Sequence, residues 1–67
     1  MTIEQLKYIV AIARSGSLKA AAAEQHVTLP ALSQALTNLE RELNISLFRR
    51  SRTGTTPTEE GNKLIQH

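Results

Sequence analysis

Apolar residues recur at helical spacing in the first part of the chain. The positions, each three or four residues from the next, are Ile3, Leu6, Val10 and Ala13. This spacing places them on one face of an α-helix. Thr2 can cap the start of that helix, and Gln5 stands three residues later, where it completes a capping box. We expect the helix to end at Ser15-Gly16, because glycine accepts the left-handed backbone found at helix ends.

Two further helices follow, joined by a tight turn. Ser17 can cap a short helix that ends at Gln25 and contains four consecutive alanines, which favour helix formation. Thr28 can cap a third helix that ends at Leu43, and Pro30 falls in its first turn, where its missing N–H costs nothing. The apolar stripe of this third helix consists of Leu32, Leu36, Leu39 and Leu43. The two helices have the proportions of a helix-turn-helix.

The last third of the chain predicts a small hairpin and the start of a fourth helix. Residues 45–48 form a short apolar segment, which is typical of a short strand. Residues 49–54 are polar and rich in turn formers, so residues 55–57 can return as a second strand. Thr58 can cap the fourth helix, and the two glutamates after it favour the positive end of the helix dipole.

The pattern therefore predicts a mainly α fold, a winged helix-turn-helix with three helices and a small β-hairpin wing. We assign this domain to residues 1–57 and the start of a further helix to residues 58–67. With 67 residues the chain is one domain with a small core. The expected core consists of Leu6, Ile9, Val10, Ala13, Leu18, Ala21, Ala22, Leu32, Leu36, Leu39, Leu43, Leu47 and Phe48.

Composition excludes several classes of protein. Cysteine is absent, which excludes a disulfide framework and thiolate metal sites. The longest apolar run, Ile9–Ala13, is far shorter than the ~20 residues that a membrane span needs. The N-terminus has no basic stretch followed by an apolar one, so no signal peptide is visible. We interpret the chain as a cytoplasmic domain with no membrane partner.

The distribution of charge is more informative than its sum. Eight basic and six acidic residues give a net charge of +2, which by itself does not indicate nucleic acid. Arg49, Arg50 and Arg52, however, fall within four residues. Such a cluster is consistent with a polyanionic partner, and equally with a solvated loop.

The polar face of the third helix carries amides and hydroxyls. Gln34 and Asn38 have the geometry to bind adenine edges, and Ser33 or Thr37 can reach bases or phosphates. An uncharged polar face suits a surface that loses its water against a partner, although a simply exposed face remains the alternative. The first turn also suits a phosphate, to which Thr28 can add a hydroxyl.

Catalytic and metal chemistry find no support in the sequence. His26 and His67 lie 41 residues apart, and no glycine-rich phosphate loop or His-Glu-x-x-His pattern occurs. Glu40 and Glu42 are expected to be solvated. We therefore predict no catalytic residue, no metal site and no cofactor.

Three stretches resemble a known family: LKYIVAIARSGSLKAAA, HVTLPALSQALTNLERELNISLFRR and TPTEEG. Together they are similar to the N-terminal DNA-binding domain of LysR-type bacterial transcriptional regulators, over essentially the whole chain. The resemblance implies a winged helix-turn-helix that binds double-stranded DNA, with the third helix in the major groove and the wing at the minor groove. It also implies a linker helix that pairs subunits into a homodimer or higher homo-oligomer, and a C-terminal domain, outside this chain, that binds a small-molecule inducer.

The resemblance also implies which residues face DNA. Carried over by position, they are Thr28, Pro30, Ala31, Ser33, Gln34 and Thr37, with Arg50 and Arg52 from the wing. The helix face adds Asn38 to this set. Two positions depart from the family pattern, which often has Gln at Leu29 and Arg at Gln34, so the family's operator sequence does not transfer.

A different class of function stays open on this evidence. Winged helices also serve as protein–protein interaction modules through the same face, and a net charge of +2 is modest for a DNA-binding domain. Salt dependence separates the two, because binding to DNA weakens steeply with added salt.

Overall fold

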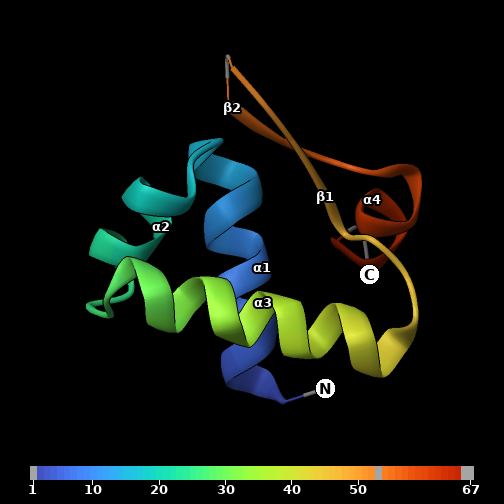
Figure 1. Cartoon of the computed structure of the whole chain (residues 1–67), viewed down its shortest axis with the longest axis horizontal. Helices are drawn as coiled ribbons and strands as arrows, with labels where there is room; N and C mark the ends of the chain where they lie inside the picture. Colours follow the sequence, from blue (N-terminus) through green and yellow to red (C-terminus); the bar gives the residue numbers. More distant parts are fainter. Residues whose placement is uncertain (1, 53, 66–67) are drawn as a thin grey trace.

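The chain follows the predicted order of helices and strands (Figure 1). The computed structural model describes residues 2–52 and 54–65; Thr53, which was expected in the hairpin turn, and His67 lie outside this range. The elements are α1 (Ile3–Ser15), α2 (Leu18–Glu24), α3 (Leu29–Leu43), β1 (Phe48–Ser51), β2 (Gly54–Pro57) and α4 (Glu59–Ile65). The mainly α winged helix-turn-helix fold is therefore confirmed.

The helix ends form as their capping residues predict. The Gln5 N–H donates to Thr2 Oγ1 at 3.1 Å, and the Thr2 N–H donates to Gln5 Oε1 at 2.9 Å, which completes the capping box of α1. Gly16 takes a left-handed φ of 71° and donates its N–H to Ile12 O at 2.9 Å. These bonds satisfy groups that a helix end otherwise leaves unpaired.

The tight turn between α2 and α3 depends on a left-handed residue that is not glycine. His26 has a φ of 59°. Its N–H donates to Ala23 O at 3.2 Å, and the Val27 N–H donates to Ala22 O at 3.0 Å. This pair of bonds is a Schellman motif, which ends α2 sharply and lets Thr28 begin the cap of α3 two residues later.

The core lies between α1, α2, α3 and the start of the wing. Its buried apolar residues are Ile9, Ala11, Ile12, Ala21, Ala22, Leu32, Leu36, Leu39, Leu47 and Phe48. Ala13, Leu18 and Leu43 pack against this cluster and are half-buried. Most of the expected core is confirmed, and Ala11 and Ile12 are additions.

The predicted face of α1 is wrong. Leu6 and Val10 are each 38% exposed, and Ile3 is 76% exposed. At about 100° per residue, Ile12 lies opposite Ile3 on the helix, and Ile9 lies about 120° from Ile3. Both sides of α1 are apolar, so spacing alone does not decide which one is buried.

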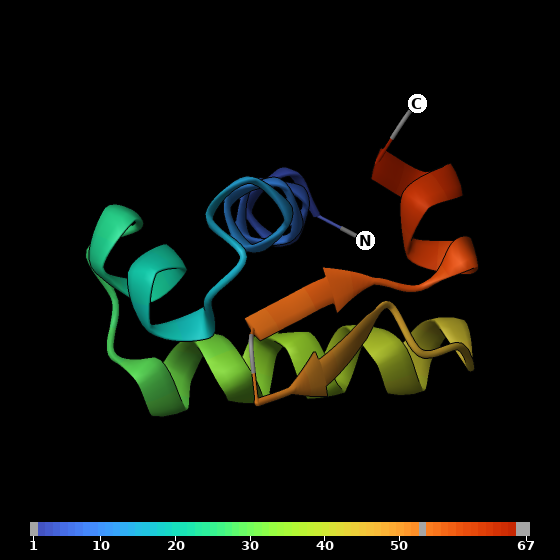
Figure 2. The same cartoon turned by 90° about the horizontal axis from the view of Figure 1, so that it is seen from above.

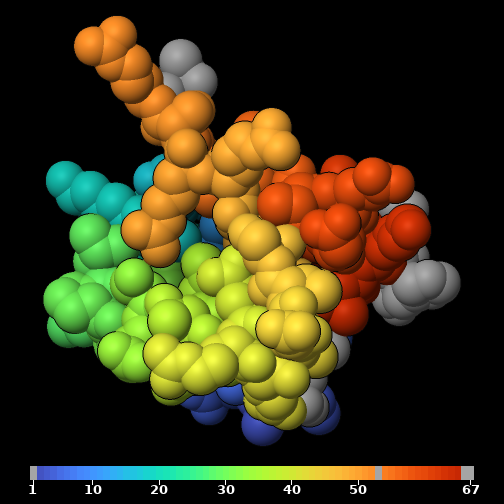
Figure 3. Space-filling view, turned by 45° about the vertical axis from the view of Figure 1, so that its right-hand side comes forward, coloured from blue at the N-terminus to red at the C-terminus, as the bar shows by residue number. Residues whose placement is uncertain are grey.

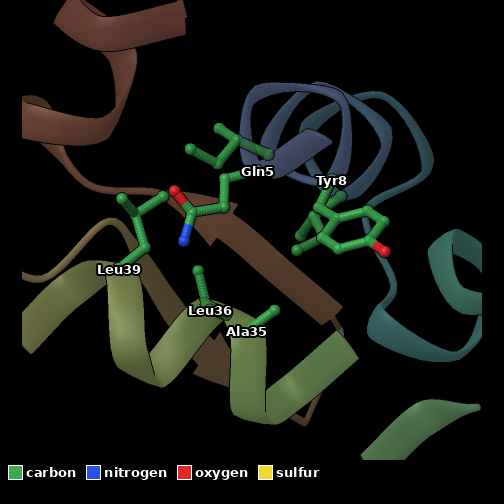
Figure 4. Close-up of a pocket in the computed structure, with 7 residues that line it drawn as sticks. Gln5, Tyr8, Ala35, Leu36 and Leu39 are labelled. Atoms are coloured by element: carbon green, nitrogen blue, oxygen red, sulfur yellow. The ribbon is translucent and has the colours of Figure 1, made fainter. Parts of the chain in front are cut away.

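The buried side of α1 meets α3 with almost no space between them. Gln5 and Tyr8 of α1 face Ala35, Leu36 and Leu39 of α3 across a small cavity (Figure 4). Its volume is about 10 Å³, which is no more than about one water-sized probe. This gap is therefore a feature of helix packing and not a ligand site.

The wing differs from the prediction in where its first strand begins. β1 starts at Phe48 instead of residue 45, so Arg49 and Arg50 are strand residues. Phe48 pairs with Pro57 and Arg50 with Thr55 in the antiparallel register. Pro57 closes the end of the ladder, as expected for a residue that cannot donate a backbone bond.

The segment before Phe48 is occupied by other hydrogen bonds, which explains the late start of β1. The Ile45 N–H donates to Glu40 O at 3.2 Å, and Asn44 takes a left-handed φ of 57° to end α3. The Leu47 N–H donates to Glu40 Oε2 at 2.6 Å, and Leu47 O accepts from the Thr58 N–H at 2.9 Å. The Ile45 and Leu47 N–H groups are therefore taken by Glu40 of α3, and the bond between Thr58 and Leu47 continues the hairpin register one pair beyond the strands.

The wing and α4 are held against the helices at two close approaches. The Thr55 N–H donates to Gly16 O at 2.9 Å, which joins β2 to the end of α1. A Cβ at Gly61 would lie 2.1 Å from Leu47 O, so α4 reaches this position only because residue 61 is glycine. The predicted cap of α4 is confirmed, because Thr58 Oγ1 accepts from the Gly61 N–H at 3.0 Å.

Leu36→Ala should lower the free energy of unfolding by roughly 2–5 kcal/mol, because it removes a buried side chain and enlarges the gap between α1 and α3. Chemical denaturation measures the change. Leu29→Ala on the same helix is the control and should change stability by less than about 0.5 kcal/mol, because Leu29 is 43% exposed. A loss below about 1 kcal/mol for Leu36→Ala would place Leu36 outside the core.

Candidate nucleic-acid interface

One side of α3 carries only exposed residues. Its leucine stripe packs inward. At about 100° per residue, the positions of the leucines also determine which residues lie on the opposite side of the helix. We define this outward face by the exposed residues Pro30, Gln34, Thr37, Asn38 and Arg41. Thr28 and Ala31, at the start of the helix, are also exposed.

The predicted contact residues of α3 are therefore accessible, with one difference. Ser33 is half-buried and lies at the margin of the outward face, between it and the leucine stripe. Arg41 was not among the predicted contacts, although it lies seven residues, or about two turns, after Gln34 on the same line of the helix. That spacing is the signal by which the sequence identifies it.

Two amides of the outward face are joined to each other. Gln34 Nε2 donates to Asn38 Oδ1 at 2.9 Å, across one turn of α3. Side chains four residues apart on a helix are neighbours, so the bond forms without distortion of the backbone. Two polar atoms of the pair take no part in this bond. They are the acceptor Gln34 Oε1 and the donor Asn38 Nδ2.

The charge of the interface differs from the prediction at Glu40. This residue was expected to be solvated, but it is half-buried and its carboxylate accepts the Leu47 N–H. Its negative charge is thus directed toward the root of the wing and away from the outward face. The outward face consequently carries one charge, the guanidinium of Arg41.

The first turn of α3 offers less to a phosphate than the sequence implies. Pro30 has no N–H, and the Ala31 N–H already donates to Thr28 Oγ1 at 3.2 Å. The hydroxyl hydrogen of Thr28 can still donate to an anion. This end of the helix is therefore a capped terminus with one side-chain donor.

The wing rises from the side of the molecule on which α3 lies. In Figure 2, α3 and β1 lie along one edge of the molecule, and α1 lies on the other side of β2. Figure 3 shows the wing standing out from the surface next to the broad side of α3. Arg49, Arg50 and Arg52 are all exposed. Successive strand residues point to opposite faces, so Arg49 and Arg50 place charge on both sides of the wing.

The described residues give little support for a metal site or a membrane-spanning helix. Across residues 2–52 and 54–65, no group of three or more His, Asp or Glu side chains is placed to hold a metal ion. Within the same part of the chain, no helix is both long and apolar enough to cross a membrane. On α1, the hydrogen bond that Tyr8 donates to Glu4 (2.8 Å) raises the pKa of the Tyr8 phenol, and this contact lies outside the interface.

A polar helix face without acidic side chains, together with a basic wing, is typical of one class of protein, the winged helix-turn-helix DNA-binding domain. Residues 3–62 match the family model of the bacterial regulatory helix-turn-helix proteins of the lysR family. Because this match covers most of the chain, the chain belongs to the LysR family of transcriptional regulators.

Individual relatives agree with this assignment. The chain is 46% identical over 66 residues to a probable RuBisCO transcriptional regulator of Gracilaria tenuistipitata var. liui, covering 98% of this chain and 21% of that protein. It is 46% identical over 67 residues to the nitrogen assimilation regulatory protein nac of Escherichia coli, covering all of this chain and 22% of that protein. The chain thus spans about a fifth of the length of these regulators.

Solved structures show the same architecture. The crystal structure of the CbnR DNA-binding domain in complex with DNA superposes with a TM-score of 0.92 at 35% identity, covering 98% of this chain and 76% of that one. Together with the family match, this likeness identifies the chain as a DNA-binding domain of transcriptional regulation.

Glu40→Ala should lower the free energy of unfolding by about 1.5–3 kcal/mol, because it leaves the Leu47 N–H without its charged acceptor. Glu40→Gln is the matched control: it keeps an oxygen at that position and should lose less. Chemical denaturation of both variants measures the difference. A loss below about 0.5 kcal/mol for Glu40→Ala would show that the carboxylate bond to Leu47 does not stabilise the wing root.

Proposed function

We propose that this domain binds double-stranded DNA sequence-specifically, with α3 in the major groove and the wing at the minor groove and phosphate backbone. The observation that carries the proposal is the polar, acid-free outward face of α3 together with three exposed arginines on a wing that rises from the same side of the molecule. The predicted contact residues are Thr28, Pro30, Ala31, Ser33, Gln34, Thr37, Asn38, Arg50 and Arg52, and Arg41 joins them because it lies on the outward face.

The two parts of the interface have different chemistry and hence different tasks. Amide and hydroxyl groups on α3 match the hydrogen-bonding patterns of base edges in the major groove. Arginine binds phosphates through its planar fork of donors and also enters narrow minor grooves. Base contacts give sequence preference, and phosphate contacts position the domain on the duplex.

For the whole regulator we infer an assembly that extends beyond this chain. α4 is the start of a linker helix through which subunits form a homodimer or higher homo-oligomer, and a C-terminal domain binds a small-molecule inducer. The division into residues 1–57 and 58–67 belongs to this inference. Such a regulator acts in the bacterial cytoplasm, where the DNA is, and catalyses no reaction. A dimer that spans two half-sites gains affinity through effective concentration.

Salt should weaken binding of generic duplex DNA to the domain steeply. If the three wing arginines each neutralise one phosphate, affinity should fall about 40-fold between about 50 and about 200 mM salt. An NMR titration of the backbone amides at both salt concentrations measures this fall and locates the contacts, which should include Thr28, Gln34, Thr37, Arg50 and Arg52. Shifts confined to other surfaces would contradict the groove-and-wing arrangement and favour a protein-interaction module.

Arg52→Ala and Gln34→Ala should have different effects on DNA binding. Arg52→Ala should weaken binding to all sequences alike and reduce the salt dependence by one phosphate contact, because arginine at the wing neutralises phosphate. Gln34→Ala should change the sequence preference, because its amide faces the bases. Fluorescence anisotropy on a panel of duplexes distinguishes them. Equal losses on every duplex for both variants would remove Gln34 from base recognition.

A further inference from the structure

The hydrogen bond between the side-chain amides of Gln34 and Asn38 affects which base the domain can select. We propose that Asn38 is a positioning residue that holds the Gln34 amide in the orientation that binds adenine and rejects guanine. This inference rests on the proposed function, because it concerns the same face of α3. Its basis is the 2.9 Å hydrogen bond from Gln34 Nε2 to Asn38 Oδ1 on the exposed side of the helix.

The chemistry of the amide group allows one side chain to make both contacts. Nε2 of glutamine carries two hydrogens, and Oε1 accepts. In the proposed arrangement, Asn38 takes the hydrogen that points away from Oε1. The other hydrogen lies along the same edge as Oε1, so that edge presents one donor and one acceptor. Adenine offers the complementary pair in the major groove, with N7 as acceptor and the N6 amino group as donor.

Guanine makes a different demand on the amide. It presents two acceptors, N7 and O6, so the Oε1 of a held Gln34 meets an acceptor where adenine has its N6 donor. Only the amino end of the amide, with both Nε2 hydrogens, can donate to N7 and O6 together, and one of those hydrogens is taken by Asn38 Oδ1. A free glutamine can turn its amino end toward guanine, whereas a glutamine held by Asn38 keeps Oε1 on the edge that faces the base.

The surroundings leave Gln34 with few alternative restraints. Gln34 and Asn38 are both exposed, and Arg41, the nearest cation on the outward face, is a donor that does not compete for Nε2. On an exposed helix such an amide pair contributes only about 0.2–0.5 kcal/mol, so the isolated bond is a weak bias. Its effect grows at a DNA interface, because a donor left unpaired there loses its water as well.

The experiment compares variants of residue 38 on one set of duplexes. Selection from randomised duplexes with the unaltered chain gives the preferred sequence, and the base pair whose preference disappears in Gln34→Ala is the one that Gln34 contacts. Binding is then measured with adenine, guanine or 7-deazaadenine at that position. We expect the unaltered chain to prefer adenine over guanine by about 5- to 150-fold, and to lose affinity for 7-deazaadenine, which lacks the N7 acceptor.

Three substitutions distinguish positioning from other roles. Asn38→Ala should reduce the adenine preference by about 2- to 12-fold, the effect of losing one neutral hydrogen bond. Asn38→Asp, which can only accept, should keep the adenine preference while its negative charge weakens binding to all duplexes. Asn62→Ala makes the same deletion as Asn38→Ala at an exposed site on α4 and should change neither quantity.

A double substitution identifies whether Asn38 acts through Gln34. In a chain with Gln34→Ala, adding Asn38→Ala should leave the base preference unchanged. A preference that Asn38→Ala leaves intact, or lowers equally with and without Gln34, would overturn the proposal while DNA binding itself stands. A chain that binds no duplex at either salt concentration would overturn the proposed function and this inference together.

The free protein supplies an independent readout of the same bond. The two side-chain N–H resonances of Gln34 should be well separated in the unaltered chain, and Asn38→Ala should shift the hydrogen-bonded one toward the position of a free amide. The same resonances should stay in place in Asn62→Ala. An Asn38→Ala spectrum with unchanged Gln34 side-chain resonances would overturn the restraint on which the proposal depends.

Discussion

The main chain of Leu47 is held from both sides, and the relation of the wing to the helices depends on it. Its N–H donates to the carboxylate of Glu40 on α3, and its carbonyl accepts from the Thr58 N–H at the start of α4. Its side chain is fully buried in the core. One residue therefore joins α3, the wing root and α4, and no large shift of any of them leaves these bonds intact.

The bonds at Leu47 also explain the roles of two other residues, Glu40 and Gly61. Glu40 directs its carboxylate at Leu47, which keeps an acidic group from the surface that approaches phosphate. Gly61 allows α4 to approach Leu47 O at a distance that any Cβ would prevent. The same close packing that stabilises the small domain thus keeps the Glu40 carboxylate away from the outward face and sets the direction in which α4 leaves the domain.

The sequence predicted the elements whose ends are decided locally. Thr2, Thr28 and Thr58 cap helices as expected, because a side-chain oxygen satisfies an N–H only three residues away. The stripe of leucines on α3 was correct because its opposite side is polar. The prediction for α1 was wrong at Leu6 and Val10 because both sides of that helix are apolar, and only packing against α2 and α3 selects the side that carries Ile9 and Ile12.

The candidate interface, like the fold, was predicted from the sequence only where its features are local. By itself the sequence determined the helix-turn-helix, the polar, acid-free face of α3 and the presence of an arginine cluster, because each follows from residues close together in the chain. Only the tertiary structure decided that β1 begins at Phe48, that Glu40 turns inward and that the wing rises from the same side of the molecule as α3. These features depend on bonds between residues 40, 47 and 58, whose partners are known only once the chain has folded.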